Sequence, residues 1–170
     1  MRTRRPCRTS TTSKEVRLGR IVGLPAVHQG RAAGRVEQAV LTPDGQRLRG
    51  LILRQGMGGA RWTAAEDVLI LGQVSVILKR PPGRVPAHAD FTLSAVKDSG
   101  GMLLGWVTDV YLDAATRAVS ALEVDLGPIE TLRAGRLLAR AFAVSPEDGC
   151  VMIPCGCALE RPQRHETGGD

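Results

Sequence analysis

Aromatic side chains are scarce in this sequence. Only 3% of its 170 residues are aromatic: two Trp, two Phe and one Tyr. A surface that binds nucleic acid by stacking on the bases needs exposed aromatic rings, so the composition argues against one. Since 43% of the residues are nonetheless hydrophobic, the core must consist mainly of aliphatic side chains. This balance is typical of a globular protein.

Long apolar segments are also missing. No run approaches the roughly 20 apolar residues that a membrane-spanning helix needs. The arginine-rich start of the sequence lacks the apolar stretch of a secretory signal. Three of the four cysteines crowd the stretch from 150 to 157, which is not the pattern of an extracellular disulfide framework. We therefore expect a cytoplasmic protein.

The net positive charge is concentrated in the first twenty residues. The chain carries a net charge of +6, and residues 1–20 hold seven basic residues and one acidic residue, so the remainder is neutral. Residues 1–13 show no hydrophobic periodicity and are predicted to form a disordered basic tail. Such a tail could bind RNA phosphates, contact an acidic protein or have no role. The residues that would make the contact are Arg2, Arg4, Arg5 and Arg8.

The neutral remainder divides again into halves of opposite charge. Residues 21–84 carry nine basic and four acidic groups, and residues 85–170 carry seven basic and twelve acidic groups. This asymmetry could favour docking of the two halves or head-to-tail self-association. Alternatively, both are solvated surfaces whose charges contribute little to stability.

Two stretches of the sequence resemble each other. Residues 34–53 read GRVEQAVLTPDGQRLRGLIL, and residues 105–124 read GWVTDVYLDAATRAVSALEV. They align without a gap at a constant spacing of 71 residues (105 − 34), here called the repeat offset. This offset places Gly34 on Gly105 and, upstream, Gly30 on Gly101. Self-similarity at a fixed offset predicts two copies of one structural module.

Both stretches have the pattern of β-structure. Apolar and polar residues alternate in them, and Thr-Pro-Asp-Gly at 42–45 is strong turn chemistry. Further strands are expected at 15–18, 61–63, 74–78, 91–96, 137–144 and 151–153. Five or six short strands per copy indicate a small barrel, because closing a sheet removes its exposed edges. The predicted fold class is all-β with minor helix, in the form of two tandem small β-barrels.

The expected domain boundaries follow from this repeat. Residues 1–13 form the basic tail, 14–80 the first repeat, 81–89 a proline-rich linker, 90–160 the second repeat and 161–170 a frayed C-terminus. The linker composition is that of an extended, semi-rigid segment.

The pattern of each copy resembles the PRC-barrel family. The first copy offers Arg20-Ile21-Val22, Gly30, Gly34-Arg35-Val36, Asp44-Gly45 and Glu66-Asp67-Val68, and the second offers Gly101, Gly105-Trp106-Val107, Asp113 and 140–144. The resemblance covers roughly residues 15–160. It departs from the family at 64–65, where Ala-Ala replaces a usual proline, and at an insertion, GPIETLRAGR, in the second copy.

The resemblance implies a binding and assembly module rather than an enzyme. Relatives include the cytoplasmic domain of the photosynthetic reaction-centre H subunit, the C-terminal domain of RimM-type ribosome maturation factors, and small stand-alone proteins, some from sporulating bacteria. A bacterial, non-catalytic protein-binding module with an unidentified protein partner is therefore expected. The alternative is an RNA- or ribosome-associated maturation factor that uses the arginine-rich tail.

No catalytic or cofactor-binding residue is expected. The three histidines are scattered, and no nucleophile or metalloprotease motif is present. Glu66 and Asp67 are interpreted as a turn or helix-start pair that satisfies free backbone N–H groups. Glycines 30, 34, 101 and 105 are interpreted as structural, because a glycine that opens a strand permits a sharp bend or the close approach of a neighbouring backbone.

Two sets of side chains leave alternatives open. Cys150, Cys155 and Cys157 are weak zinc candidates that would need a fourth ligand such as His165. The alternatives are a structural role for small apolar side chains and a redox pair. We expect no cofactor. Trp62 and Trp106 are packing residues or, if exposed, anchors for a partner.

Overall fold

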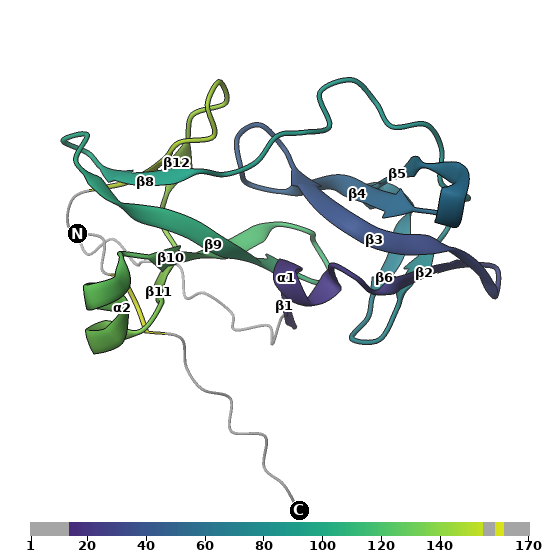
Figure 1. The fold of residues 1–170 in the computed structure, drawn as a ribbon, viewed down its shortest axis with the longest axis horizontal. Coiled ribbons are helices and arrows are strands. Elements are labelled where there is room, and N and C mark those ends of the chain that lie inside the picture. Colours follow the sequence, from purple (N-terminus) through teal and green to yellow (C-terminus); the bar gives the residue numbers. More distant parts are fainter. Residues whose placement is uncertain (1–13, 155–158, 162–170) are drawn as a thin grey trace, which may run out of the picture.

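A computed structural model describes residues 14–154 and 159–161 of the chain. Two curled sheets lie side by side, each forming a half-barrel (Figure 1). The first has the strand order β5-β4-β3-β2-β7-β6, with β2 Pro25–His28, β3 Arg31–Leu41, β4 Leu48–Arg54, β5 Ala60–Ala64, β6 Val68–Leu71 and β7 Val76–Leu78. Two short 3-10 helices, Gly56–Gly58 and Ala65–Asp67, flank β5.

The second sheet repeats the strand order of the first. It runs β11-β10-β9-β8-β13-β12, with β8 Ala95–Asp98, β9 Leu103–Asp113, β10 Val119–Asp125, β11 Leu137–Ala139, β12 Ala143–Val144 and β13 Val151–Ile153. In each sheet the strand that opens the copy pairs in parallel with the strand that closes it, β2 with β7 and β8 with β13. An additional strand, β1 Glu15–Arg17, pairs with β9. The predicted all-β class is confirmed, because the helices are few: α1 Leu18–Ile21, α2 Pro128–Ala134 and the two 3-10 turns.

The two copies also share their strand register. Arg35 pairs with Arg54 in the first sheet, and the residues at the repeat offset from them, Trp106 and Asp125, pair in the second. Three irregularities in the pairing recur in equivalent places: one in the β2–β3 and β8–β9 pairs, and two in the β3–β4 and β9–β10 pairs. Because β-bulges bend a strand at a defined residue, their repetition gives both sheets the same curvature.

The β-hairpin turns of the two copies join them through a reciprocal pair of hydrogen bonds. The Leu48 N–H donates to the Arg117 carbonyl at 2.9 Å, and the Val119 N–H donates to the Gln46 carbonyl at 2.8 Å. These two bonds exchange places under the repeat offset, so they lie about an internal pseudo-twofold axis. The Arg117 side chain adds bonds to the carbonyls of Val68 and Leu69 in β6.

The segment that leads into each copy packs on the other copy. Residues 15–17, assigned to the first repeat by the sequence analysis, lie instead in the second sheet as β1. Conversely, the proline-rich segment 81–89 is bonded to the first sheet: Gly83 and Trp62 exchange two hydrogen bonds, and the Arg49 guanidinium donates to the His88 carbonyl at 2.7 Å. In Figure 1 this segment runs over the top of the molecule from β7 to β8.

One continuous apolar core connects the two sheets. It contains fully buried side chains of the first copy, such as Leu51 and Leu53, and of the second, such as Leu112 and Leu122. Ile21 of α1 is fully buried in the same cluster, and Phe91 and Leu93 pack against it from the connecting segment. The two half-barrels therefore share their hydrophobic stabilisation and are not separate cores on a flexible tether.

The observed strands differ from the predicted ones in several places. The sequence did not predict β2 and β6, and β7 begins at Val76 rather than at residue 74. Residues 91–94 precede β8 without joining a strand, because Phe91 and Leu93 turn toward the shared core. The predicted strand 137–144 is divided into β11 and β12, which pair with different neighbours, β10 and β13. The second-copy insertion contains α2.

We predict that Gly105→Ala destabilises the protein by about 1–3 kcal/mol, the usual cost of forcing atoms into a packed site. A Cβ at Gly105 would lie 2.0 Å from the Asp125 carbonyl oxygen, and one at Gly34 would lie 2.8 Å from that of Arg54. Urea unfolding measures the effect. Gly58→Ala is the matched control, because a Cβ there meets nothing within 4 Å. Equal stability of the two variants would contradict the close-approach role of Gly105.

Candidate functional site

The most deeply buried charged group in the described part of the chain is Glu123 of β10. It is only 2% exposed. Two guanidinium groups contact its carboxylate at 2.9 Å, Arg17 of β1 and Arg136 after α2. Two hydroxyl groups also donate to it at 3.2 Å, those of Thr108 and Tyr111 in β9. Both carboxylate oxygens are therefore fully used within the fold.

A second carboxylate, Asp109, completes this polar cluster. The Arg17 Nε donates to Asp109 at 2.6 Å, and the Gly19 backbone N–H donates to the same side chain at 2.9 Å. A Cβ at Gly19 would lie 2.5 Å from a carboxylate oxygen of Asp109, so a larger residue there would displace that side chain. The cluster thus fixes β1 and α1 to the second sheet, and every polar atom named is occupied by a partner in the chain. These bonds connect β1 and α1 with β9, β10 and Arg136 after α2.

The first copy has no such cluster at the equivalent position. The residue that corresponds to Glu123 is Ile52, which pairs with Trp62. Trp62 lies over the bare backbone of Gly50, where a Cβ would come within 2.3 Å of the ring, and the Arg49 guanidinium lies 5.9 Å from the ring centre. Trp62 is therefore a packing residue, half-buried against its own sheet.

Trp106 is placed quite differently from Trp62. It is 56% exposed and pairs with Ala95 of β8 on the outer face of the second sheet. The neighbouring outward row crosses four strands through the pairs Ala143–Met152, Met152–Lys97 and Lys97–Leu103. Met152 is 47% exposed and Leu103 52% exposed. We call Trp106 and this row of four residues the outer apolar face of the second copy.

The first copy carries a row of the same kind. The pairs Ile70–Ile77, Ile77–Val27 and Val27–Ala32 cross β6, β7, β2 and β3. Ile70 is 57% exposed, Ala32 is exposed, and Ile77 and Val27 are half-buried. Each row occupies the positions that alternate with buried core residues, such as Val76 in the first copy and Val151 in the second. Apart from Lys97, the outward positions in these two rows are thus apolar, where the solvated face of a sheet is usually polar.

The predicted structural residues lie in turns or where two neighbouring strands approach each other closely. Gly30 and Gly101 both have positive φ angles, at 75° and 84°, in equivalent hairpins. Glu66 and Asp67 lie in the 3-10 turn after β5, and Asp67 faces the Arg80 guanidinium at 3.6 Å. Gly34 and Gly105 lie where a neighbouring strand comes close, as described above.

The cysteine cluster falls largely outside the described residues. Cys150 is buried beside β13, and its N–H donates to the Asp148 side chain at 3.0 Å. Cys155, Cys157 and His165 lie outside the described ranges, as do the tail residues Arg2, Arg4, Arg5 and Arg8. Within those ranges, no three His, Cys, Asp or Glu side chains come together as a metal site would require.

Comparison with known proteins leaves the family open. No family model matches the chain, and no curated protein matches it. None of the helices described for this chain has the length and apolar character needed to cross a membrane.

The Glu123 cluster generates the first prediction from this site. Glu123→Gln keeps the side-chain size but removes the charge that two guanidinium groups contact, so it should lower the free energy of unfolding by about 1.5–3 kcal/mol. Hydrogen exchange should show faster opening of residues 15–21, with little change in β4. Glu147→Gln, at an exposed turn residue, is the control and should leave both measurements unchanged. Unaltered protection of residues 15–21 in Glu123→Gln would contradict the role of this polar cluster in fixing β1 and α1.

The second prediction concerns Tyr111, the one tyrosine of the chain. Burial raises the pKa of its phenol, the Arg17 charge opposes that rise, and the Glu123 carboxylate adds to it. Because the pKa is higher in the folded state, the stability from the neutral phenol is present below about pH 10 and is lost as the pH rises through the folded-state pKa. Ultraviolet absorbance should show a higher titration midpoint for the folded than for the urea-unfolded protein. Coincident midpoints would contradict this.

Proposed function

We propose that the chain is a non-catalytic protein-binding and assembly module built from two tandem half-barrels of the PRC type. The observation that carries this proposal is the outer apolar face of the second copy, with the exposed Trp106 beside the row Ala143, Met152, Lys97 and Leu103. The strand order and register common to both sheets support the tandem arrangement, and the resemblance in sequence supports the family.

The chemistry of this face suits a protein partner. Contiguous exposed apolar surface marks interaction sites on soluble proteins, and tryptophan is among the residues that contribute most to binding energy at interfaces. Methionine adapts its shape to a partner, and the aliphatic stem of Lys97 can extend apolar contact while its ammonium group stays in water. The four strands of the row are spaced about 4.8 Å apart, so the face is about 14 Å wide. That width accommodates one helix or a pair of strands.

The duplication gives the chain two such surfaces. The row of the first copy, Ile70, Ile77, Val27 and Ala32, has the same place in its sheet and similar chemistry. Because the reciprocal turns and the shared core hold the sheets together, two bound partner elements would be kept at a fixed spacing. A rigid bivalent binder raises the effective concentration of the second partner once the first is bound. This supports a role in assembly rather than simple capture.

The non-catalytic part of the proposal rests on the polar cluster. Glu123, Asp109 and Arg17, which would be the first candidates for chemistry on burial alone, are bonded to one another or to backbone and hydroxyl groups of the fold. The expected alternative, an RNA- or ribosome-associated factor, would use the tail at residues 1–13, outside the described ranges. A nuclease step in the experiment distinguishes the two.

The test is affinity purification of the tagged protein from its native lysate, with nuclease treatment. The variant Trp106→Ser/Leu103→Ser/Met152→Ser should lose at least one protein that the wild type retains, by about tenfold or more in quantitative mass spectrometry, because it removes the apolar anchors. Leu132→Ser, at an exposed leucine of α2, is the matched control and should retain that protein. Melting curves check that each variant is folded.

Two results would contradict the proposal. One is an identical set of retained proteins for the wild type and the triple variant. The other is loss of every retained protein on nuclease treatment, which would favour the RNA-associated alternative.

A further inference from the structure

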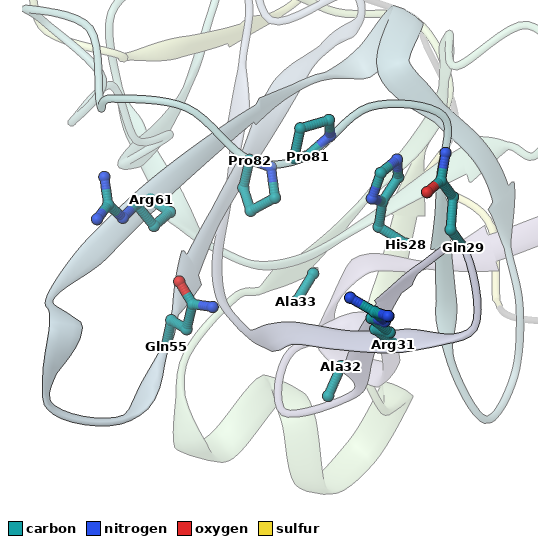
Figure 2. A pocket seen from close by; sticks show the side chains of 9 residues that line it. All are labelled: His28, Gln29, Arg31, Ala32, Ala33, Gln55, Arg61, Pro81 and Pro82. Carbon is teal, nitrogen blue, oxygen red and sulfur yellow. The ribbon is translucent and has the colours of Figure 1, made fainter.

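A groove of about 440 Å³ opens on the first copy. Of the four residues in the outer row of this copy, only Ala32 lines the groove. Figure 2 shows His28, Gln29 and Arg31 from the β2–β3 hairpin on one side and Gln55 and Arg61 from the β4–β5 hairpin on the other. Pro81 and Pro82 lie across the groove between them. This volume is within the usual range for small-ligand sites, about 300–1,000 Å³.

The lining of the groove is rich in hydrogen-bond donors and contains no carboxylate. The lining includes two arginines, one histidine and two glutamines, all within the described ranges. Neither the Arg31 nor the Arg61 side chain forms an ion pair or hydrogen bond with another described residue. By contrast, Arg54 of the first copy and Arg17 and Arg140, in or next to the second sheet, are each paired with acids. The two groove arginines thus keep their charges available to a ligand.

The second copy acts as an internal control for this charge. By strand register, the positions equivalent to His28 and Arg61 are Asp98 and Leu137, and the repeat offset places Met102 on Arg31. The same backbone therefore folds with an acid, a leucine and a methionine in these places. Since the fold does not require basic residues there, the fold alone does not account for the donors of the first copy.

The walls of the groove are held in place before any ligand arrives. Pro81 and Pro82 have φ angles fixed by their rings, and the next residue, Gly83, is bonded in both directions to Trp62 of β5. On the opposite wall, Gln29 and Gly30 have φ angles of 49° and 75° in a tight hairpin turn. A non-glycine residue in this conformation is uncommon, and at this position it places a carboxamide at the groove. Preorganised donors lose less entropy on binding.

We propose that this groove is a binding site for a phosphate-bearing ligand. Guanidinium groups bind phosphate oxygens through paired charge-assisted hydrogen bonds, and two of them on opposite walls suit a ligand with more than one phosphate. The carboxamides supply neutral N–H donors for the remaining oxygens. The phosphates could belong to a small polyphosphate compound or to the backbone of single-stranded RNA. The site is separate from the outer apolar face of the second copy and shares only Ala32 with the row of the first copy.

The experiment is isothermal titration of the full chain with two probes, tripolyphosphate and a single-stranded RNA of about eight nucleotides. Arg31→Gln/Arg61→Gln should raise the dissociation constant of the bound probe at least tenfold. Arg133→Gln removes the same kind of charge from α2, which lies at the opposite end of the molecule from β2 and β5 in Figure 1, and should change the dissociation constant less than twofold. Melting curves confirm that the variants fold.

The two probes distinguish the source of the phosphates. Tighter binding of tripolyphosphate than of RNA assigns the site to a small polyphosphate ligand. Tighter binding of RNA, weakening steeply with salt, assigns it to a nucleic acid backbone. The proposal is overturned if both probes bind the double variant as tightly as the wild type, or if Arg133→Gln loses as much affinity as the double variant. It is also overturned if polyglutamate, an anionic polymer without phosphate, binds as tightly as both probes. If Arg31→Gln/Arg61→Gln still retains the protein partner in the affinity purification, the groove acts independently of the outer apolar face.

Discussion

The exchange of two backbone hydrogen bonds between the hairpin turns is the constraint on which the rest of this structure depends. Leu48 and Val119 each donate across the pseudo-twofold axis to the turn of the other copy. Neither half-barrel is closed, so each leaves apolar side chains that a single sheet cannot cover. Joining the turns brings those side chains into one core and positions the lead-in segments, which then bind across the axis. The outward rows of the two sheets stay accessible, because neither the shared core nor the lead-in segments cover them.

The repeat was the part of the fold that the sequence predicted best. Apolar alternation and the paired glycines depend on local geometry, which is visible in one stretch of chain at a time. The turn at 42–47 shows why: Pro-Asp-Gly in one copy and Ala-Ala-Thr in the other both end in the same backbone closure, Thr42 to Arg47 and Asp113 to Ala118. The exchange of lead-in segments could not be predicted, because Val16 is equally compatible with the edge of either sheet. Only the position of Asp109 and Glu123 in the second sheet decides between them.

The candidate surfaces were missed for a related reason. A strand in which every residue is apolar is usually buried on both faces. The strands that contain Met152 and Ile77 are of this kind, so their sequences predict that both side chains are buried. The single sign in the sequence was Trp106, which stands where the first copy has Arg35. The donors of the groove are likewise scattered over residues 28 to 61 and meet only because β2, β3 and β5 belong to one sheet. Differences between copies, rather than their similarity, indicate where each has acquired a role.

The pairing of β1 with β9 has a consequence for biosynthesis. Glu15 lies opposite Asp113, so the whole first copy is synthesised before β1 can find its partner strand. At ribosomal rates of about 5–20 residues per second, β1 waits about 5–20 s for the strand that completes it. During that interval the first copy also lacks the turn that covers β6, and its apolar row and its half of the core are both accessible. The nascent chain is therefore most exposed to misassociation with a neighbouring copy on the same message, since that copy presents the same turn and the same strand edge.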